Sequence, residues 1–332
     1  MTCASADEPS QAPVVAAPSP AAPPSFQTWI EGVRTEALAR GISQRTVDEA
    51  LASVEHLDIV VQRDRTQAEM TLNLDRYLKL RLTSRLVKTA RKAYAEQKPL
   101  LARVERQFGV PGPVVVAIWG LESHFGRFTG IRPTVAALAT LSFEGRRTEM
   151  FREELFAALK ILDQGDVTLA QLRGSWAGTL GQPQFMPSVY LTDAVDFDAD
   201  GRRDIWSSAP DVLASIANYL KTRGWVAGQR WGREVTMSDR VASRVASEVP
   251  LRFAGACRAV REMSEARPLR TWASLGVRLK SGGPLPKDDM NDSLIRVDRR
   301  TFLIYANYEA LLAYNCANTY ALSVALLADR IG

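Results

Sequence analysis

The chain of 332 residues is poor in the residues that build metal and redox sites. It has three cysteines, Cys3, Cys257 and Cys316, in no metal-ligand spacing. Its two histidines, His56 and His124, are too few for a histidine-rich metal site. Cys257 and Cys316 are able to pair in an oxidising compartment, although the sequence alone does not show that they do.

Long apolar runs and nucleotide-binding signatures are also missing. No stretch of roughly 18 or more apolar residues occurs, so no transmembrane helix is predicted. The N-terminus lacks the apolar core of a signal peptide, which taken literally predicts a cytoplasmic protein. The net charge of +5 favours anionic partners. No dense Lys/Arg block with interleaved aromatics is present, so we expect no nucleic-acid partner.

The first 25 residues differ in composition from the rest of the chain. They contain six prolines, many alanines, no aromatic residue and almost no charge, which is typical of an extended, disordered linker. A cysteine near the start, Cys3, followed by a proline-rich tether also resembles a lipoprotein whose leader has been removed. The alternative is an ordinary free cysteine in a disordered tail.

Periodicity divides the remaining chain. Apolar residues at helical spacing predict an all-helical domain over residues 26–100. Short β-branched or alternating segments, separated by turn signals, predict a small β-rich insertion over residues 229–305. Helical patterning resumes at Asn307. The predicted fold class is therefore mainly α (α+β).

One carboxyl group ends the most apolar run in the middle of the chain. Residues 114–121 carry no charge, and Glu122 follows them directly, before a turn that Gly126 favours. A helix that is apolar on every face is a buried one. A buried strand is the alternative, because three consecutive valines begin the run and periodicity alone does not decide. In either case Glu122 emerges from a core into a turn of small residues.

Such a carboxyl group has physical reasons to stay protonated near neutral pH. Burial disfavours its charged form, and the negative end of a helix dipole does the same. No lysine or arginine lies close in sequence until Arg127. A neutral carboxylic acid in a pocket is what a general acid requires. The alternative is a glutamate at a helix C-terminus that simply reaches solvent.

A compact loop runs from Gly174 to Ser188 and contains three glycines and two prolines. Glycine lets a backbone approach a ligand closely. In this loop Gln184 would be able to read hydroxyl or amide groups, and Phe185 to lie under a sugar face. The alternative is a tight helix–helix connection in which Phe185 and Met186 fill the core.

Acidic residues alternate along the segment Asp196–Asp204, with Gly201 at its sixth position. This spacing matches the template of a calcium-binding loop, in which glycine permits a sharp turn. Arg202, at the seventh position, would contribute only its backbone carbonyl. Four carboxylates in nine residues would repel one another strongly without a cation.

The match to the calcium template is imperfect. Arg203 stands where an apolar residue is usual, and Ser207 where a bidentate glutamate is usual. Asp211 would close the site instead, although it also suits a capping box with Ser208. We expect a bound, structural cation over residues 196–211, and the alternative is a solvated acidic turn.

Taken together, these motifs resemble the lytic murein transglycosylase B family of bacterial cell-wall enzymes. The order and spacing of several motifs carry the resemblance: Glu122-Ser123-x-Phe125-Gly126, Gly174-Ser175 through Ser188-x-Tyr190, Asp196–Asp204, Ala217-Asn218-Tyr219 and Tyr314-Asn315. The glutamate motif alone is shared with lysozyme-like enzymes, whereas the combination is specific. The resemblance extends from about Phe26 to the C-terminus and leaves the linker outside.

The resemblance implies an N-terminal helical domain over 26–100, a lysozyme-like catalytic core over 101–228 and 306–332, and a small inserted β-rich domain over 229–305. It implies one catalytic glutamate, Glu122. It implies a structural Ca²⁺ ion and no organic cofactor, with the ligands Asp196, Asp198, Asp200, the carbonyl of Arg202, and Asp211. The residues implied to line the saccharide groove are Ser123, Ser175, Gln184, Phe185, Met186, Tyr219, Tyr314, Asn315, Tyr320 and, with a poorer local match, Tyr77.

The implied activity is cleavage of peptidoglycan glycan strands by a monomer in the periplasm, with an outer-membrane lipid anchor at Cys3 as a further expectation. Glu122 would protonate the glycosidic oxygen between N-acetylmuramic acid and N-acetylglucosamine. The substrate's N-acetyl group would support the developing positive charge, which removes the need for a second carboxylate. Glu122 would then accept the proton of the muramic C6 hydroxyl, which attacks the anomeric carbon and gives a 1,6-anhydro product.

Two other functions remain open from the sequence. A hydrolytic muramidase would use water in place of the C6 hydroxyl and would need a second positioned carboxylate, for which Asp193 is a candidate. A peptidoglycan-binding protein would keep the groove without the chemistry. Four glutamates on charged segments are expected to face solvent and to take no part in catalysis: Glu144, Glu149, Glu153 and Glu154.

Overall fold

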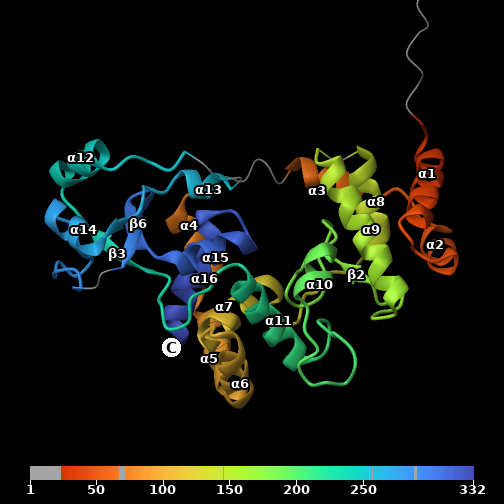
Figure 1. The fold of residues 1–332 in the computed structure, drawn as a ribbon, viewed down its shortest axis with the longest axis horizontal. Coiled ribbons are helices and arrows are strands. Elements are labelled where there is room, and N and C mark those ends of the chain that lie inside the picture. Colours follow the sequence, from red (N-terminus) through yellow and green to blue (C-terminus); the bar gives the residue numbers. More distant parts are fainter. Residues whose placement is uncertain (1–23, 67–71, 145, 254, 256, 288–289) are drawn as a thin grey trace, which may run out of the picture.

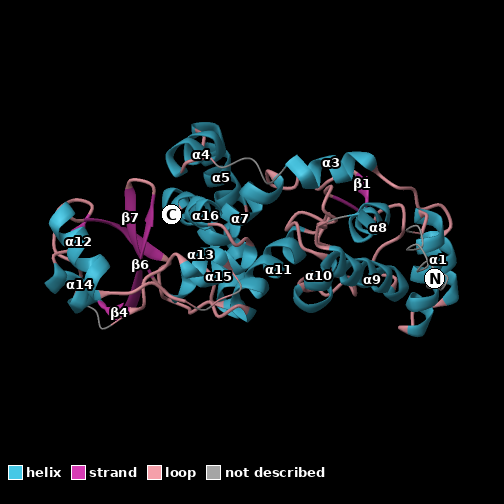
Figure 2. Ribbon diagram, turned by 90° about the horizontal axis from the view of Figure 1, so that it is seen from above, coloured by secondary structure: helices cyan, strands magenta, loops and turns pink. Residues whose placement is uncertain are grey.

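The structure is a computed structural model that describes residues 24–66, 72–144, 146–253, 255, 257–287 and 290–332. Cys3 and nearly all of the predicted linker lie outside these residues. The described chain forms three groups of elements that lie side by side along the longest axis of the molecule (Figure 1 and Figure 2). The first group holds the N-terminal helices, the second holds the C-terminus, and the third holds the main sheet.

The first group is helical apart from two short paired strands. Its elements are α1 (Phe26–Ala39), α2 (Gln44–Leu51), α3 (Asp58–Thr66), β1 (Arg132–Pro133), α8 (Thr134–Glu144), α9 (Thr148–Gln164), β2 (Arg173–Gly174) and α10 (Pro187–Asp193). The two strands pair antiparallel, with Arg132 opposite Gly174. This pairing brings the chain just after Glu122 beside the start of the glycine-rich loop.

The middle group consists of helices. They are α4 (Leu74–Arg81), α5 (Ser84–Glu96), α6 (Lys98–Phe108), α7 (Gly112–Ser123), α11 (Ala209–Thr222), α13 (Arg258–Arg261), α15 (Ala306–Tyr314) and α16 (Asn318–Ile331). Helix α7 packs against α5, α6, α11 and α16. The uncharged run therefore forms a helix and not a strand. Because other helices surround it, almost every one of its residues is buried.

The third group contains the main sheet. Its elements are β3 (Gly232–Thr236), α12 (Asp239–Glu248), β4 (Arg267–Pro268), α14 (Leu269–Leu275), β5 (Arg278–Leu279), β6 (Asn291–Val297) and β7 (Arg300–Ile304). The strands are ordered β4-β6-β7-β3-β5 and pair antiparallel. Trp272 of α14 is fully buried against one face of this sheet and centres a separate small core.

The prediction of one helical domain over residues 26–100 needs correction. Helices α1 to α3 belong with α8 and α9 in the first group, whereas α4 to α6 pack against α7, α11 and α16 in the middle group. An amphipathic pattern shows which face of a helix is buried but not which helix buries it. The sequence therefore located the helices without assigning them to their partners.

None of the described helices alone is long and apolar enough to cross a bilayer, although α15 and α16 together reach the required length and composition across a bend of 116°. Both helices are largely buried within the protein.

Candidate active site

The C-terminal end of α7 is held by a sharply folded turn. His124, Phe125 and Gly126 follow one another in the left-handed region, with φ of 50°, 60° and 81°. The ring of Phe125 folds back onto α7, where a Cβ atom on Gly120 would come within 2.7 Å of it. A Cβ atom on Gly126 would lie 2.5 Å from the side-chain oxygen of Gln182. The two glycines thus allow the Phe125 ring to pack closely on α7 and the turn to pack closely against Gln182.

Glu122 is half-buried, one residue before the end of α7. Its carboxyl oxygen Oε1 accepts a hydrogen bond of 2.5 Å from the hydroxyl of Tyr320 on α16. Burial raises the pKa of Glu122 to about 7, against the hydrogen bond from Tyr320 and the charge of Arg81, which both lower it. Near neutral pH the group is therefore poised to give a proton and to take one back.

Arg81 was missed by the reasoning from sequence, which found no basic residue near Glu122 until Arg127. Its guanidinium donates a hydrogen bond of 3.1 Å to the backbone carbonyl of Leu121. Arg81 stands at the end of α4, forty-one positions before Glu122 in the chain, and only the packing of α4 beside α16 brings the two together. No local pattern would have identified this contact.

A row of aromatic rings extends from the carboxyl group. The ring of Tyr314 stacks on that of Tyr320 at 6.3 Å, and Tyr219 meets Tyr314 edge-on at 4.8 Å. Phe185 contacts both Tyr219 and Tyr314. Burial and then the charge of Glu122 raise the pKa of Tyr320 and of Tyr314 well above the ordinary value. These hydroxyls therefore stay protonated and act as hydrogen-bond donors.

The hydroxyls of Tyr314 and Tyr219 form hydrogen bonds that link neighbouring elements. Tyr314 donates to the carbonyl of Pro183 at 2.7 Å, and Tyr219 donates to the carbonyl of Ala313 at 2.6 Å. The first bond joins α15 to the glycine-rich loop, and the second joins α11 to α15. The row is thus part of the scaffold as well as a wall beside Glu122.

The predicted polar residues of the glycine-rich loop bond to one another. The Ser175 hydroxyl oxygen accepts from the backbone N–H groups of Ala177 and Thr179. The amide of Gln184 donates to the carbonyls of Gly181 and Thr129, and its oxygen accepts from the Thr179 hydroxyl. Both residues are half-buried, so each keeps some surface open while shaping the loop.

Two of the predicted groove residues are placed differently from the expectation. Ser123 is fully buried, and its hydroxyl donates to the Trp119 carbonyl and accepts from the Gly126 backbone N–H. Phe185 is 2% exposed and packs within the aromatic row, so it offers no free face to a sugar. The alternative considered for Phe185, a side chain that fills the core, describes it correctly. Ser123 stabilises the turn, which a sequence motif does not distinguish from ligand contact.

The remaining predicted residues lie at the edge of this cluster. Met186 and Tyr77 are half-buried, and Asn315 is exposed at the end of α15. Tyr77 is close enough for its charge to influence Tyr320. A contact from these three to a ligand stays a prediction.

Two further carboxyl groups, of Asp193 and Glu154, are buried and form hydrogen bonds within the protein. Asp193 is buried, and it accepts hydrogen bonds from Thr222 at 2.6 Å and Arg223 at 3.2 Å. Glu154 was expected to face solvent, and this is wrong. It is 9% exposed and accepts from both the backbone N–H and the hydroxyl of Ser188, at the start of α10.

Three of the predicted cation ligands converge. Carboxylate oxygens of Asp196, Asp198 and Asp211 lie within 4.8 Å of one another. Asp211 is fully buried at the first turn of α11, and its two oxygens accept backbone N–H groups of Phe197 and Asp204, at 2.7 Å and 2.8 Å. Burial and the neighbouring charge of Asp198 raise the pKa of Asp211. These oxygens form a suitable donor set for a hard divalent cation.

The other two predicted ligands are less clearly placed. The carboxylate of Asp200 accepts the backbone N–H of Arg202 and is not one of the three that converge. Ser208 caps α11 by accepting the Asp211 backbone N–H, as considered from the sequence. The capping box is therefore only half formed, because the Asp211 carboxylate accepts the backbone N–H groups of Phe197 and Asp204, and the backbone N–H of Ser208 donates to the Asp204 carbonyl.

Gln182, which the sequence did not single out, joins the acidic loop to α7. Its side-chain oxygen accepts from the Trp119 indole N–H at 2.6 Å, and its side-chain nitrogen donates to the Trp206 carbonyl at 2.8 Å. Trp206 lies two residues after Asp204 in the chain. A disulfide between Cys257 and Cys316, left open by the sequence, links the start of α13 to the break between α15 and α16.

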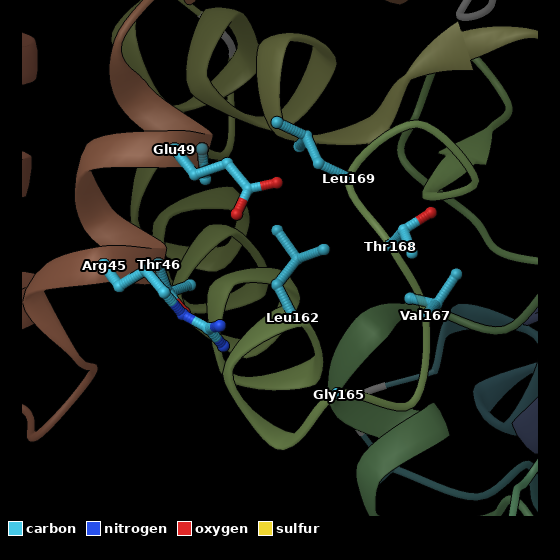
Figure 3. A pocket seen from close by; sticks show the side chains of 9 residues that line it. Arg45, Thr46, Glu49, Leu162, Gly165, Val167, Thr168 and Leu169 are labelled. Atoms are coloured by element: carbon cyan, nitrogen blue, oxygen red, sulfur yellow. The ribbon is translucent and has the colours of Figure 1, made fainter.

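A separate small cavity of about 220 Å³ lies in the first group of helices, between α2 and the end of α9 (Figure 3). Arg45 and Glu49 of α2 extend toward Leu162 of α9 across it. It contains none of the predicted site residues, so the chemistry of the molecule is centred on Glu122 instead.

Comparison with known proteins identifies the family. Residues 25–329 match the family model described as "Transglycosylase SLT domain". The chain is 31% identical over 327 residues to "Membrane-bound lytic murein transglycosylase B" of Escherichia coli (strain K12), covering 93% of this chain and 82% of that protein.

Solved structures are similar too. SltB3 from Pseudomonas aeruginosa, in complex with NAG-anhNAM-pentapeptide, is 41% identical with a TM-score of 0.82, covering 92% of this chain and 79% of that one. The Escherichia coli lytic transglycosylase Slt35, in complex with calcium, is 27% identical with a TM-score of 0.74, covering 92% of each chain.

The helical core and these relatives together define a lysozyme-like lytic transglycosylase. The chain belongs to the transglycosylase SLT domain family, as the match over nearly its whole length shows.

Proposed function

We propose that the protein cleaves the bond between N-acetylmuramic acid and N-acetylglucosamine in peptidoglycan and leaves 1,6-anhydro-N-acetylmuramic acid ends. Glu122 acts first as general acid and then as general base. The related enzyme from Pseudomonas aeruginosa has been solved with NAG-NAM-pentapeptide and with NAG-anhNAM-pentapeptide, which supports both the substrate and the anhydro product.

The observation that carries this proposal is the state of the Glu122 carboxyl group. Its pKa of about 7 is matched to a group that must donate a proton in one step and accept one in the next. The hydrogen bond from Tyr320 holds one oxygen in place, which leaves the other oxygen for the substrate. No other described carboxyl group combines this pKa with partial exposure.

The reaction balances without a second carboxylate. Protonated Glu122 donates to the glycosidic oxygen as the C1–O bond breaks, and the N-acetylglucosamine unit leaves as an alcohol. The substrate's N-acetyl oxygen supports the positive charge at C1. Glu122, now anionic, takes the proton of the C6 hydroxyl as that oxygen bonds to C1, and the carboxylic acid is restored.

The hydrolytic alternative is disfavoured by the environment of Asp193. A muramidase needs a second carboxylate that activates water or stabilises the sugar cation. Asp193, the candidate from the sequence, is buried and already accepts hydrogen bonds from Thr222 and Arg223. A carboxylate with these partners is poorly placed to do either task.

Mass spectrometry of the products tests the proposal directly. Purified peptidoglycan is digested with the wild-type protein and, in parallel, with Glu122→Gln. We expect muropeptides one water lighter than hydrolytic products, and none with the variant. Fully hydrated products would identify a muramidase, and bound but uncut polymer would identify a binding protein.

We further propose that the acidic loop holds Ca²⁺. The three converging carboxylates of Asp196, Asp198 and Asp211 fit a hard cation, and the calcium complex of Slt35 supports the choice. The ion would relieve repulsion between these groups and fix the start of α11. Asp200 and the Arg202 carbonyl are proposed to complete the coordination.

The location is proposed from the relative and the N-terminal composition. The Escherichia coli relative is named as membrane-bound, which supports a periplasmic enzyme attached to the outer membrane through a lipid at Cys3. A monomer is proposed, with peptidoglycan strands as its partner.

A further inference from the structure

Helix α4 connects the inserted sheet to the catalytic glutamate. At its first residue, the backbone N–H of Leu74 donates to the carboxylate of Asp298, in the turn between β6 and β7. At its last residue, the guanidinium of Arg81 donates to the carbonyl of Leu121 at 3.1 Å, directly before Glu122. One short helix therefore spans from the hairpin to the end of α7.

The hairpin holds the first turn of α4 at two points. Asp298 occupies the turn with φ of 53°, a conformation that aspartate and asparagine tolerate better than most residues. Arg300 approaches the carboxylate of Asp75 at 4.0 Å and is itself fixed by two hydrogen bonds of 2.8 Å to Glu234 on β3. Leu74, 1% exposed, anchors the same turn in the core.

Burial raises the pKa of Glu122, and two ionisable groups on the surrounding elements lower it: Tyr320 on α16, through its hydrogen bond, and Arg81 on α4, through its charge. Tyr314 on α15 stacks on Tyr320, and the charge of Glu122 raises the pKa of Tyr314. The tyrosines are neutral, so Arg81 is the member of this set that carries a permanent charge. It stabilises the anionic form of Glu122, and its hydrogen bond to Leu121 holds the last turn of α7.

We propose that Arg81 is a positioning residue for Glu122, and that the β6–β7 hairpin of the insertion keeps Arg81 in place through the first turn of α4. This inference rests on the proposed function, in which Glu122 alternates between its acid and base forms. The inserted domain thereby influences the chemistry without contacting the reacting atoms. Tyr77, one helical turn before Arg81, is held beside Tyr320 by the same arrangement.

An NMR titration of the Glu122 carboxyl carbon measures this effect without relying on catalysis. The protein is labelled with carboxyl-¹³C glutamate, and the resonance is assigned by its absence in Glu122→Gln. In Arg81→Met we expect the pKa of Glu122 to rise by about half to one unit, since a partly solvated positive charge is lost. Arg81→Lys, which keeps the charge, should stay near the wild type.

Activity provides the second measurement. The first step needs protonated Glu122, so the alkaline limb of the pH profile should move to higher pH in Arg81→Met, in step with the NMR value. We expect kcat to fall about three- to tenfold with little change in KM, because the residue acts on Glu122 and not on the substrate. Lys79→Met removes a charge from the same helical turn and should leave both measurements unchanged.

The hairpin is tested separately. Asp298→Ala removes the acceptor for Leu74 and should move the pKa of Glu122 in the same direction as Arg81→Met, by a smaller amount. Asp298→Asn keeps an acceptor oxygen and the tolerance for positive φ, and should restore the wild-type value. Thermal unfolding of each variant shows that it is folded at the temperature of the titration.

The outcomes separate the inference from the proposed function. An unchanged Glu122 pKa in folded Arg81→Met overturns the role of Arg81, and an unchanged pKa in folded Asp298→Ala overturns the role of the hairpin. If the wild-type protein forms no anhydro products, the proposed function fails instead. The NMR titration remains valid in that case, because it does not depend on turnover.

Discussion

Glu122 and Asp211 are both carboxyl groups whose pKa is raised by burial, but they differ in their hydrogen-bond partners and in the charges around them. Glu122 accepts a hydrogen bond from a tyrosine beside a row of aromatic rings. Asp211 accepts two backbone N–H groups and lies beside two further aspartates. In the first arrangement the protonated and ionised forms of the carboxyl group are close in free energy near neutral pH. In the second, three carboxylates lie close together. Burial acts on both groups, and the neighbouring side chains distinguish the proposed proton donor from the proposed cation ligand.

The largest effect should come from making Glu122 permanently neutral. In Glu122→Gln we expect kcat/KM to fall by about 10³-fold or more, because an amide neither donates nor accepts the transferred proton. Calcium binding, followed by calorimetry, should be unchanged. Glu149→Gln, at an exposed position of α9, is the matched control and should keep full activity. Activity within tenfold of the wild type in Glu122→Gln would remove this glutamate from the mechanism.

The second largest effect concerns Asp211, the proposed calcium ligand in this comparison. Asp211→Asn should lower the free energy of unfolding by about 2–3 kcal/mol, since an amide nitrogen faces backbone N–H donors that were satisfied by a carboxylate. It should also abolish the rise in melting temperature that calcium gives the wild type. Asp239→Asn, exposed on α12, is the control. A variant that still gains stability from calcium would show that Asp211 is not a ligand.

The pH dependence of the free energy of unfolding tests the raised pKa of Glu122. The pKa of Glu122 rises from 4.5 to about 7 on folding, so the native state holds a proton that the unfolded chain releases between these values. The wild type therefore loses stability as pH rises through this window, whereas Glu122→Gln does not. We expect the variant to gain up to about 3 kcal/mol relative to the wild type between pH 4.5 and pH 8. Urea unfolding at the two pH values measures the difference, and parallel curves would contradict it.

The smallest effect should separate the aspartates of the acidic loop. Asp196 belongs to the converging set, and Asp200 does not. We expect the calcium Kd to rise about tenfold or more in Asp196→Asn and less than about threefold in Asp200→Asn. Equal losses would indicate that Asp200 contributes to the coordination as strongly as Asp196.

The sequence identified the features that depend on neighbours along the chain. The uncharged run before Glu122 predicted a buried element. The alternating aspartates that begin with Asp196 and Asp198 predicted the acidic loop. These signals are local, because composition decides burial and alternation places several acidic side chains in one loop. The helix itself could be distinguished from a strand only once its partners on every side were known.

Other features depend on contacts between distant segments. Arg81 lies in a helix whose composition resembles many surface helices, so nothing local connects it to Glu122. Ser123 directly follows Glu122 in the chain, yet its hydroxyl donates to the Trp119 carbonyl inside the protein. Glu154 lies on a charged segment, yet it bonds to Ser188 at the start of another helix. In each case the partner, and not the residue type, decides the role.

The bond between Cys257 and Cys316 closes a covalent ring that contains most of the inserted sheet, since 59 positions separate the two residues. A protease that cuts once between them, for example in the exposed turn at Gly282, cannot release a fragment. The nicked chain would migrate as one species on a gel without reductant and as two species with it. The ring therefore keeps α4 and its hairpin joined to the same molecule even after the backbone has been broken.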